Sequence, residues 1–167
     1  MGQAKIFSMR GSINGAAWPA MPIDKASLAA KLADLQVLCG LHPWTVKTWR
    51  IFLEKPTTHI VLGFEPAGKR LIASSLSQLV IDEAELLQLF VHPHFRQQSI
   101  GRTILEKMID DFKILNILNV FLEVSEKNQT AVSFYTSMGL KAYAVRKNYF
   151  RSDGNRFENA LLMRIEF

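Results

Sequence analysis

The segment HPHFRQQSIGRTIL, residues 92–105, connects two stretches of different periodicity. Before it, LLQLFV (residues 86–91) is apolar enough for a central strand. After it, apolar residues recur every four positions, which predicts an amphipathic helix: Ile100, Ile104, Met108 and Phe112. The first turn of a helix presents unpaired amide N–H groups and a positive dipole end, which bind phosphate. This turn, flanked by Arg96 and Arg102, is a candidate phosphate site, although a plain connection with surface arginines is the simpler interpretation of these residues alone.

The composition indicates one globular domain. Of the 167 residues, 49% are hydrophobic and 21% are charged, as expected for a chain that buries its own core. Helical periodicity begins at Asp24, so we expect a single domain over residues 24–167 and an N-terminal extension over residues 1–23. A transit peptide is the less favoured interpretation of this acid-poor start. No apolar run reaches membrane-spanning length, and no membrane partner is expected.

The charge and the cysteine content bear on partners and location. A net charge of +5 favours anionic partners such as a phosphorylated cofactor. An ordinary basic surface is the simpler explanation of the charge alone, and no nucleic-acid-binding signature is present, so no direct nucleic-acid partner is expected. Cys39 is the only cysteine, which excludes an internal disulfide and is consistent with a cytoplasmic protein.

The order of elements predicts an α+β fold. Two helices come first, over residues 24–39 and 45–52, and Thr45 can cap the second. Three strands follow, then a helix, a strand, a helix and two strands; the strand sequences are THIVLGFE, RLIASSLSQLVI, ELLQLFV, NVFLEV, KAYAVRKNYF and RFENALLMRIEF. The last helix begins after Asn128 and stops near Gly139, and SDGN is a hairpin signal between the last two strands. This order predicts a mixed sheet with helices packed on it.

Arg96-Gln-Gln-Ser99-Ile-Gly101 is similar to the motif Gln/Arg-x-x-Gly-x-Gly/Ala of the GNAT family, the acetyl-CoA-dependent N-acetyltransferases. The resemblance implies a mixed, mostly antiparallel sheet, flanked by helices, with splayed central strands. It also implies that the pyrophosphate of acetyl-CoA binds at Arg96, Gln97, Gln98, Ser99, Ile100, Gly101 and Arg102. Ser99 stands where the family has its first glycine, and we expect serine to keep the amide donor with a negative φ.

Further segments resemble one branch of this family, the bacterial enzymes that acetylate the N-terminal alanine of a ribosomal protein. They occur in the family's order and spacing: HPW at residues 42–44, VIDEAELLQLFVHPHFRQQSIGR, FLEVSEKNQTAVSFYTSMGL, RKNYF and DGNRFENALLM. The resemblance runs from about residue 42 to the end of the chain and does not cover the residues before Asp24. It implies a cytoplasmic enzyme whose partners are acetyl-CoA and the N-terminus of a ribosomal protein.

Two residues are candidates for proton transfer. Glu123 is the only ionisable side chain in the apolar strand NVFLEV, and burial there would raise its pKa toward neutrality. By resemblance it is the general base, acting through water; a glutamate at a sheet edge is the alternative. Tyr135, in SFYTSMG, resembles the tyrosine that protonates the departing thiolate. A half-buried aromatic on an amphipathic helix is the alternative for this residue.

The resemblance implies further contacts on both sides of the reacting carbonyl. A backbone amide of Leu89, Phe90 or Val91 is expected to hold the thioester oxygen at a bulge that splays two strands. Asn128 is expected to contact the cofactor as well as to cap its helix. The expected substrate-binding residues are Pro43, Trp44 and Tyr149.

Other interpretations stay open. His92 with His94, and Cys39 with His42, each lack further ligands, so no metal site is expected. Within the family, the acceptor could instead be a lysine side chain, a polyamine or an antibiotic amine. A non-catalytic acyl-CoA-binding module is the alternative of a different class, which the presence of both Glu123 and Tyr135 disfavours.

Overall fold

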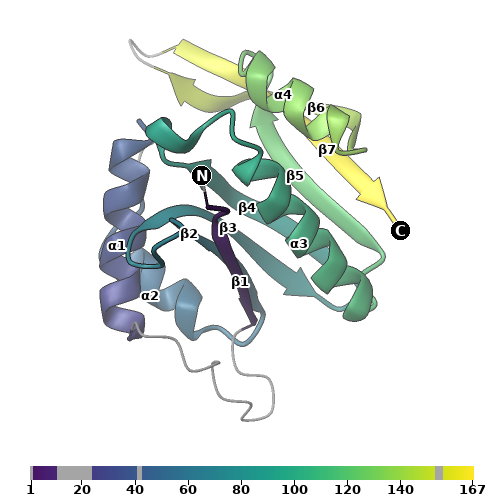
Figure 1. Ribbon diagram of the computed structural model, residues 1–167. Helices are drawn as coiled ribbons and strands as arrows, with labels where there is room; N and C mark the ends of the chain where they lie inside the picture. Colours follow the sequence, from purple (N-terminus) through teal and green to yellow (C-terminus); the bar gives the residue numbers. More distant parts are fainter. Residues whose placement is uncertain (1, 11–23, 41–42, 153–155) are drawn as a thin grey trace.

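The computed structural model describes residues 2–10, 24–40, 43–152 and 156–167. Figure 1 shows a twisted sheet with helices on both faces. The elements, in chain order, are β1 (Lys5–Arg10), α1 (Lys25–Leu38), α2 (Val46–Glu54), β2 (Thr58–Phe64), β3 (Leu71–Val80), β4 (Glu83–Val91), the short helix η1 (Pro93–Phe95), α3 (Ile100–Ile114), β5 (Asn119–Ser125), α4 (Gln129–Ser137), β6 (Lys141–Ser152) and β7 (Arg156–Glu166). Within the described residues, no helix is long and apolar enough to cross a membrane.

The sheet has the order β1-β2-β3-β4-β5-β7-β6. Every neighbouring pair is antiparallel except β4 with β5. This confirms the predicted mixed, mostly antiparallel sheet flanked by helices. The parallel pair requires a crossover, which α3 provides between β4 and β5.

Side-chain caps start three of the helices. The Asp24 carboxylate accepts the N–H of Ser27 at 2.9 Å and begins α1. The hydroxyl of Thr45 caps α2, and the side chain of Asn128 accepts the N–H of Ala131 at 3.1 Å to begin α4. Gly139, at φ +91°, ends α4 because a left-handed residue stops a helix. The caps Thr45 and Asn128 and the stop at Gly139 were predicted from local sequence, whereas the cap by Asp24 was not.

Two cores lie on opposite faces of the sheet. On one face, α1 and α2 cover β2, β3 and β4 with a core that includes Leu28, Leu32, Trp49, Leu53, Leu62 and Phe90. On the other face, α3 and α4 cover the sheet with a core that includes Ile104, Met108, Phe112, Val120, Leu122 and Tyr135. The two faces of the sheet therefore carry different pairs of helices.

β1, which lies within residues 1–23, was not predicted from the sequence. It pairs antiparallel with β2, with Lys5 opposite Phe64, and extends the sheet by one strand. Residues 11–23 lie outside the described part of the chain. The predicted SDGN turn falls mostly on residues 153–155, which are also outside it, although the strands on either side pair as a hairpin expects.

The central strands part from each other halfway along. The pairing of β4 with β5 runs from Glu83 opposite Asn119 to Leu86 opposite Leu122 and stops there. On its other side, β4 has a register shift against β3, because Leu76 lies opposite Gln88 and Ser77 opposite Leu86. Leu87 is therefore the extra residue of a β-bulge, which bends β4 away from β5. The splayed strands expected from the family resemblance are present.

Candidate active site

Glu123 lies where the two central strands separate. It is the first residue of β5 beyond Leu122, the last one paired with β4. Alternate residues of a strand point to opposite faces, and Val120, Leu122 and Val124 pack into the core under α3 and α4. The Glu123 side chain therefore points to the opposite face, the face that carries α1 and α2.

Two polar side chains of β6 hold the Glu123 carboxylate. Nη1 of Arg146 lies 2.8 Å from Oε1 of Glu123, whose side chain is 18% exposed. The Tyr149 hydroxyl also donates to Glu123. That hydrogen bond, burial and the carboxylate's charge raise the pKa of Tyr149, against a smaller opposing effect of Arg146. The carboxylate is thus bound by polar partners, in contrast to the apolar surroundings expected from its strand.

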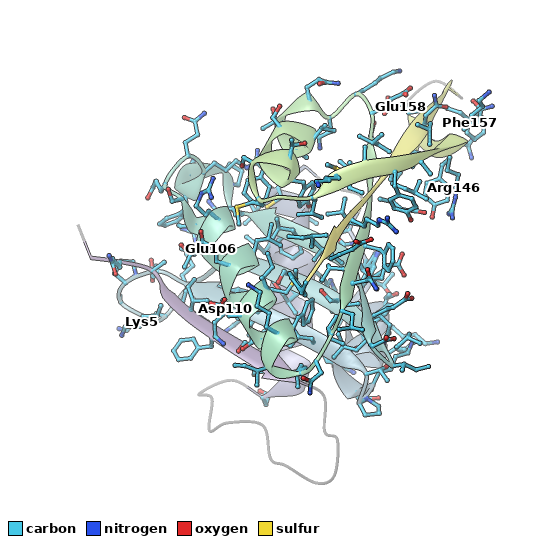
Figure 2. All side chains as sticks on the ribbon, turned by 90° about the vertical axis from the view of Figure 1, so that its right-hand side faces the viewer. Lys5, Glu106, Asp110, Arg146, Phe157 and Glu158 are labelled. Atoms are coloured by element: carbon cyan, nitrogen blue, oxygen red, sulfur yellow. The ribbon has the colours of Figure 1, made fainter. Side chains whose placement is uncertain are left out.

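An irregularity in β6 brings Tyr149 to this position. The register with β7 shifts between Arg146 and Phe150, so that extra residues arch away from the ladder. Asn148, within this arch, has a φ of +53°, and its N–H donates to Asn159 Oδ1 at 3.0 Å. Figure 2 shows Arg146 on the β6–β7 hairpin. Arg146 was not predicted from the sequence, because the register of β6 with β7 decides which cation faces Glu123.

Tyr135 lies on the opposite side of the sheet. Its side chain is 9% exposed, in the core beneath α3 and α4, and its ring is 5.2 Å from that of Phe134. Burial raises the pKa of Tyr135 to about 12, so the phenol is protonated at neutral pH. Glu123 and Tyr135 therefore lie on opposite faces of the sheet, at the end where β4 and β5 diverge.

The turn before α3 leaves amide groups available. The first helical hydrogen bond runs from the Thr103 N–H to the Ser99 carbonyl at 3.0 Å, and no side chain caps the helix. The amides of Ile100, Gly101 and Arg102 therefore have no partner within the helix. A Cβ built on Gly101 would meet only ordinary contacts, 3.6 Å from Val91 and 3.8 Å from Phe134.

The conformation of this turn differs from the expected one. Ser99 has a φ of +59°, in the left-handed region, so the negative φ expected from the sequence is wrong. Gln97 also has a φ of +59°. A left-handed position favours glycine because it has no Cβ. This explains physically why the family motif has glycine where this chain has Ser99.

The side chains of the turn differ in their partners. Arg96 donates through Nε to the Val91 carbonyl at 3.1 Å and through Nη2 to the Cys39 carbonyl at 3.2 Å, joining the turn to the end of α1. Gln98 donates to the His94 carbonyl at 3.1 Å. Arg102 is exposed and lies 3.4 Å from the Ser137 hydroxyl on α4. Of the two arginines in the turn, Arg102 is the one not bonded to the backbone.

The backbone of residues 89–91 borders the gap. On the β3 side, Leu89, Phe90 and Val91 pair with Ser75, Ser74 and Ala73. On the β5 side, the ladder has already ended at Leu86. The bulge expected from the family therefore lies at Leu87, just before these residues, and amides that face β5 are open to a ligand.

The other expected substrate residues lie on the α1 and α2 side. The Trp44 ring stacks on Phe52 with centroids 4.7 Å apart and lies 5.2 Å from Trp49, so one of its faces is already covered. Pro43 is exposed beside it, and His42 lies outside the described residues. Trp44 and Tyr149 therefore belong to the same face of the sheet but to separate packing groups.

No cluster in the described part of the chain has the three His, Cys, Asp or Glu side chains that a metal site needs. The rings of His92 and His94 are 5.2 Å apart. An Arg70 nitrogen lies 2.7 Å from Nε2 of His92, where a metal would otherwise bind. Burial lowers the pKa of His92, and the charge of Arg70 adds to this effect.

Comparison with known proteins agrees with this geometry. The family model for the acetyltransferase (GNAT) family matches residues 29–140. The [ribosomal protein bS18]-alanine N-acetyltransferase of Salmonella typhimurium is 31% identical over 121 residues, 72% of this chain and 79% of that protein. The enzyme of the same name from Haemophilus ducreyi is 35% identical over 134 residues, 80% of this chain and 90% of its own.

The fold has close structural relatives. The crystal structure of the ribosomal-protein-S18-alanine N-acetyltransferase from Escherichia coli superposes with a TM-score of 0.81 and 22% identity, covering 98% of this chain and 94% of that one. The family match spans more than half of the sequence, and the sequence relatives cover most of it. The chain therefore belongs to the acetyltransferase (GNAT) family and is an acyltransferase.

Proposed function

We propose that this protein transfers the acetyl group of acetyl-CoA to the N-terminal α-amine of a ribosomal protein whose first residue is alanine. The observation that carries the proposal is the position of Glu123, at the open end of the β4–β5 gap, with the protonated Tyr135 on the opposite face. The names of the sequence relatives, which acetylate ribosomal protein bS18, support the acceptor. An acceptor of this kind also supports a cytoplasmic location.

The proposed roles account for each bond that changes. Glu123 takes a proton from the incoming amine through a water molecule, which frees the nitrogen lone pair to attack the carbonyl carbon. An amide among residues 89–91 stabilises the oxyanion that forms. As the C–S bond breaks, Tyr135 gives its phenolic proton to the sulfur. The attacking nitrogen releases its second proton to solvent as the amide forms, and the Tyr135 phenolate takes a proton back from solvent. The raised pKa of Tyr135 supports this role, because the phenol holds its proton until a thiolate develops.

The turn before α3 supports acetyl-CoA as the acyl donor. The unpaired amides of residues 100–102 and the positive end of the helix dipole suit a pyrophosphate. Left-handed residues at Gln97 and Ser99 curve the backbone in the way that anion-binding turns require. Arg102, which also pairs with Glu106 at 3.8 Å, adds an exposed positive charge beside it.

The environment of Glu123 supports an α-amine over a lysine amine. An α-amine has a pKa near ~8 and a lysine near ~10.4, so the α-amine loses its proton far more readily at neutral pH. Arg146, beside Glu123, disfavours a permanently charged ammonium by repulsion. Tyr149 and Trp44 then provide the face against which a short peptide N-terminus binds.

A pair of peptides tests the acceptor. One has a free N-terminal alanine and no lysine; the other is blocked at its N-terminus and contains one lysine. We expect the free N-terminus to be acetylated roughly a hundredfold faster at neutral pH, following the ~2.4 difference in pKa. Faster acetylation of the blocked peptide would overturn the α-amine assignment. A non-catalytic acyl-CoA-binding module would give a different result. Acetyl-CoA would raise the melting temperature, but neither peptide, nor any amine in a cell extract, would be acetylated.

A further inference from the structure

A fully buried glutamine connects the two halves of the acceptor side. Gln36, near the end of α1, is 0% exposed and lies within the core of α1 and α2. Its Oε1 accepts the backbone N–H of Trp44 and the indole N–H of Trp49, both at 2.9 Å. Its Nε2 donates to Gln88 Oε1 at 3.0 Å. One side chain thus holds α1, the start of α2 and β4 together.

The partner on β4 lies at the bulge. Leu87 is the extra residue, and both it and Gln88 contact groups on the α1 and α2 face. The next residues, 89–91, are those whose amides border the gap. The bridge Gln36–Gln88 therefore joins Trp44 to the segment of β4 that borders the gap between β4 and β5.

A leucine at position 36 would match the apolar character of the core formed by α1 and α2. It would, however, leave the Trp44 and Trp49 N–H groups without their acceptor, and buried donors without partners are costly. A buried side chain that satisfies three groups from separate elements fixes their relative positions more than packing alone does. The bridge therefore restricts where Trp44 lies relative to β4.

We propose that Gln36 is a positioning residue, which acts through Trp44 and Gln88 to set the acceptor-binding residues against the bulged part of β4. This inference rests on the proposed function for the role of Trp44. It predicts that the bridge affects the peptide acceptor more than acetyl-CoA, because the turn before α3 shares no hydrogen bond with Gln36.

Steady-state kinetics with the free-N-terminus peptide test the bridge from both ends. Gln36→Leu and Gln88→Leu are each expected to raise the peptide KM about tenfold, the effect of roughly one lost hydrogen bond, and to lower kcat. The KM for acetyl-CoA is expected to change less than twofold. Gln88→Glu is expected to restore the parent kinetics, because a carboxylate still accepts from Gln36 Nε2. Leu28→Ala, on the same helix and in the same core, is the control for lost stability alone.

Hydrogen exchange at the Trp44 amide gives a readout that requires no turnover. We expect faster exchange in both leucine variants and parent-like exchange in Gln88→Glu and Leu28→Ala. A Gln88→Leu protein with the parent's peptide KM and Trp44 exchange would overturn the inference. If the parent acetylates no free N-terminus, the proposed function fails, and the exchange experiment still decides whether the bridge positions Trp44. Should Gln36→Leu not fold, Gln88→Leu decides alone.

Discussion

At the scale of single residues, the surroundings of Glu123 explain how a carboxylate could act as a base from a fixed position. Arg146 and Tyr149 bind it from β6, so its orientation does not depend on the acceptor. The raised pKa of Tyr149 means that its hydroxyl stays protonated and donates to the carboxylate at neutral pH. Because both partners occupy the carboxylate, a bridging water is the natural path for the amine's proton.

Replacing Glu123 with glutamine removes the proposed base and keeps the shape of the side chain. We expect acetylation at neutral pH to slow by roughly 10²–10⁴-fold. Part of the rate should return as the pH rises through ~8, because the amine then loses its proton without help. Rates measured across this pH range check the prediction, with Glu85→Gln, an exposed change on the neighbouring strand, as control. A variant as active as the parent at every pH would exclude Glu123 from proton transfer.

Substitutions of Ser99 measure the cost of a left-handed residue in the turn before α3, where the pyrophosphate is proposed to bind. Ser99→Gly removes the Cβ at φ +59° and makes no new contact, so the free energy of unfolding should rise by about 1 kcal/mol. Acetyl-CoA binding should be kept or tightened. Ser99→Ala keeps the Cβ and should bring no such gain. Chemical denaturation and a binding titration measure both effects; weaker binding by the glycine variant would mean that the serine hydroxyl contacts the ligand.

At the scale of elements, local sequence signals predicted where the helices begin and end. Features that depend on pairing between distant strands were not predicted. The caps Thr45 and Asn128 and the stop at Gly139 follow from single residues, and all three are present. β1 was missed, because a six-residue strand next to a poorly patterned segment gains its stability from pairing with β2. The polar partners of Glu123 were missed for a similar reason: the irregular register of β6 depends on contacts with β7.

At Gly101, in the first turn of α3, the size of a substituted side chain should determine whether acetyl-CoA binds. The structure has room for a methyl group at Gly101, so Gly101→Ala should still bind acetyl-CoA. Gly101→Phe should weaken binding strongly, because a large side chain beside Val91 and Phe134 would fill the space in front of the open amides. Calorimetric titration of both variants measures this difference. Equal affinity of the phenylalanine variant and the parent would place the pyrophosphate elsewhere.

At the scale of the whole molecule, the sheet separates two tasks. The α3 and α4 face carries the turn before α3 and Tyr135, while the opposite face carries Trp44, Tyr149 and Glu123. With the proposed sites, an acyl donor at the turn and an amine at Glu123 would approach from opposite sides and meet where β4 and β5 part. This arrangement requires α3 to stay attached to a sheet whose central ladder is interrupted.

A polar cluster at the far end of α3 attaches it to the sheet. Oδ2 of Asp111 lies 3.0 Å from Nε2 of the buried His59 on β2, and Oδ1 contacts Lys107 one turn earlier. Ser8, on β1, also hydrogen-bonds to this carboxylate. Burial alone would raise the pKa of Asp111, but these hydrogen bonds outweigh it and lower the pKa from 3.8 to about 2.

The cluster around Asp111 predicts how the free energy of unfolding depends on pH. A carboxylate whose pKa is lowered by folding stabilises the protein fully above pH ~4, and this contribution is lost as the pH falls toward ~2. The lowered pKa of Asp111 corresponds to a contribution of about 2 kcal/mol to the free energy of unfolding.

We expect Asp111→Asn to unfold more easily at neutral pH and to lose less stability than the parent between pH 4 and pH 2. Asp110→Asn, the exposed neighbour on the same helix (Figure 2), is the control and should follow the parent. Urea denaturation at each pH measures the difference, and parallel profiles for Asp111→Asn and the parent would show that the cluster does not attach α3 in this way.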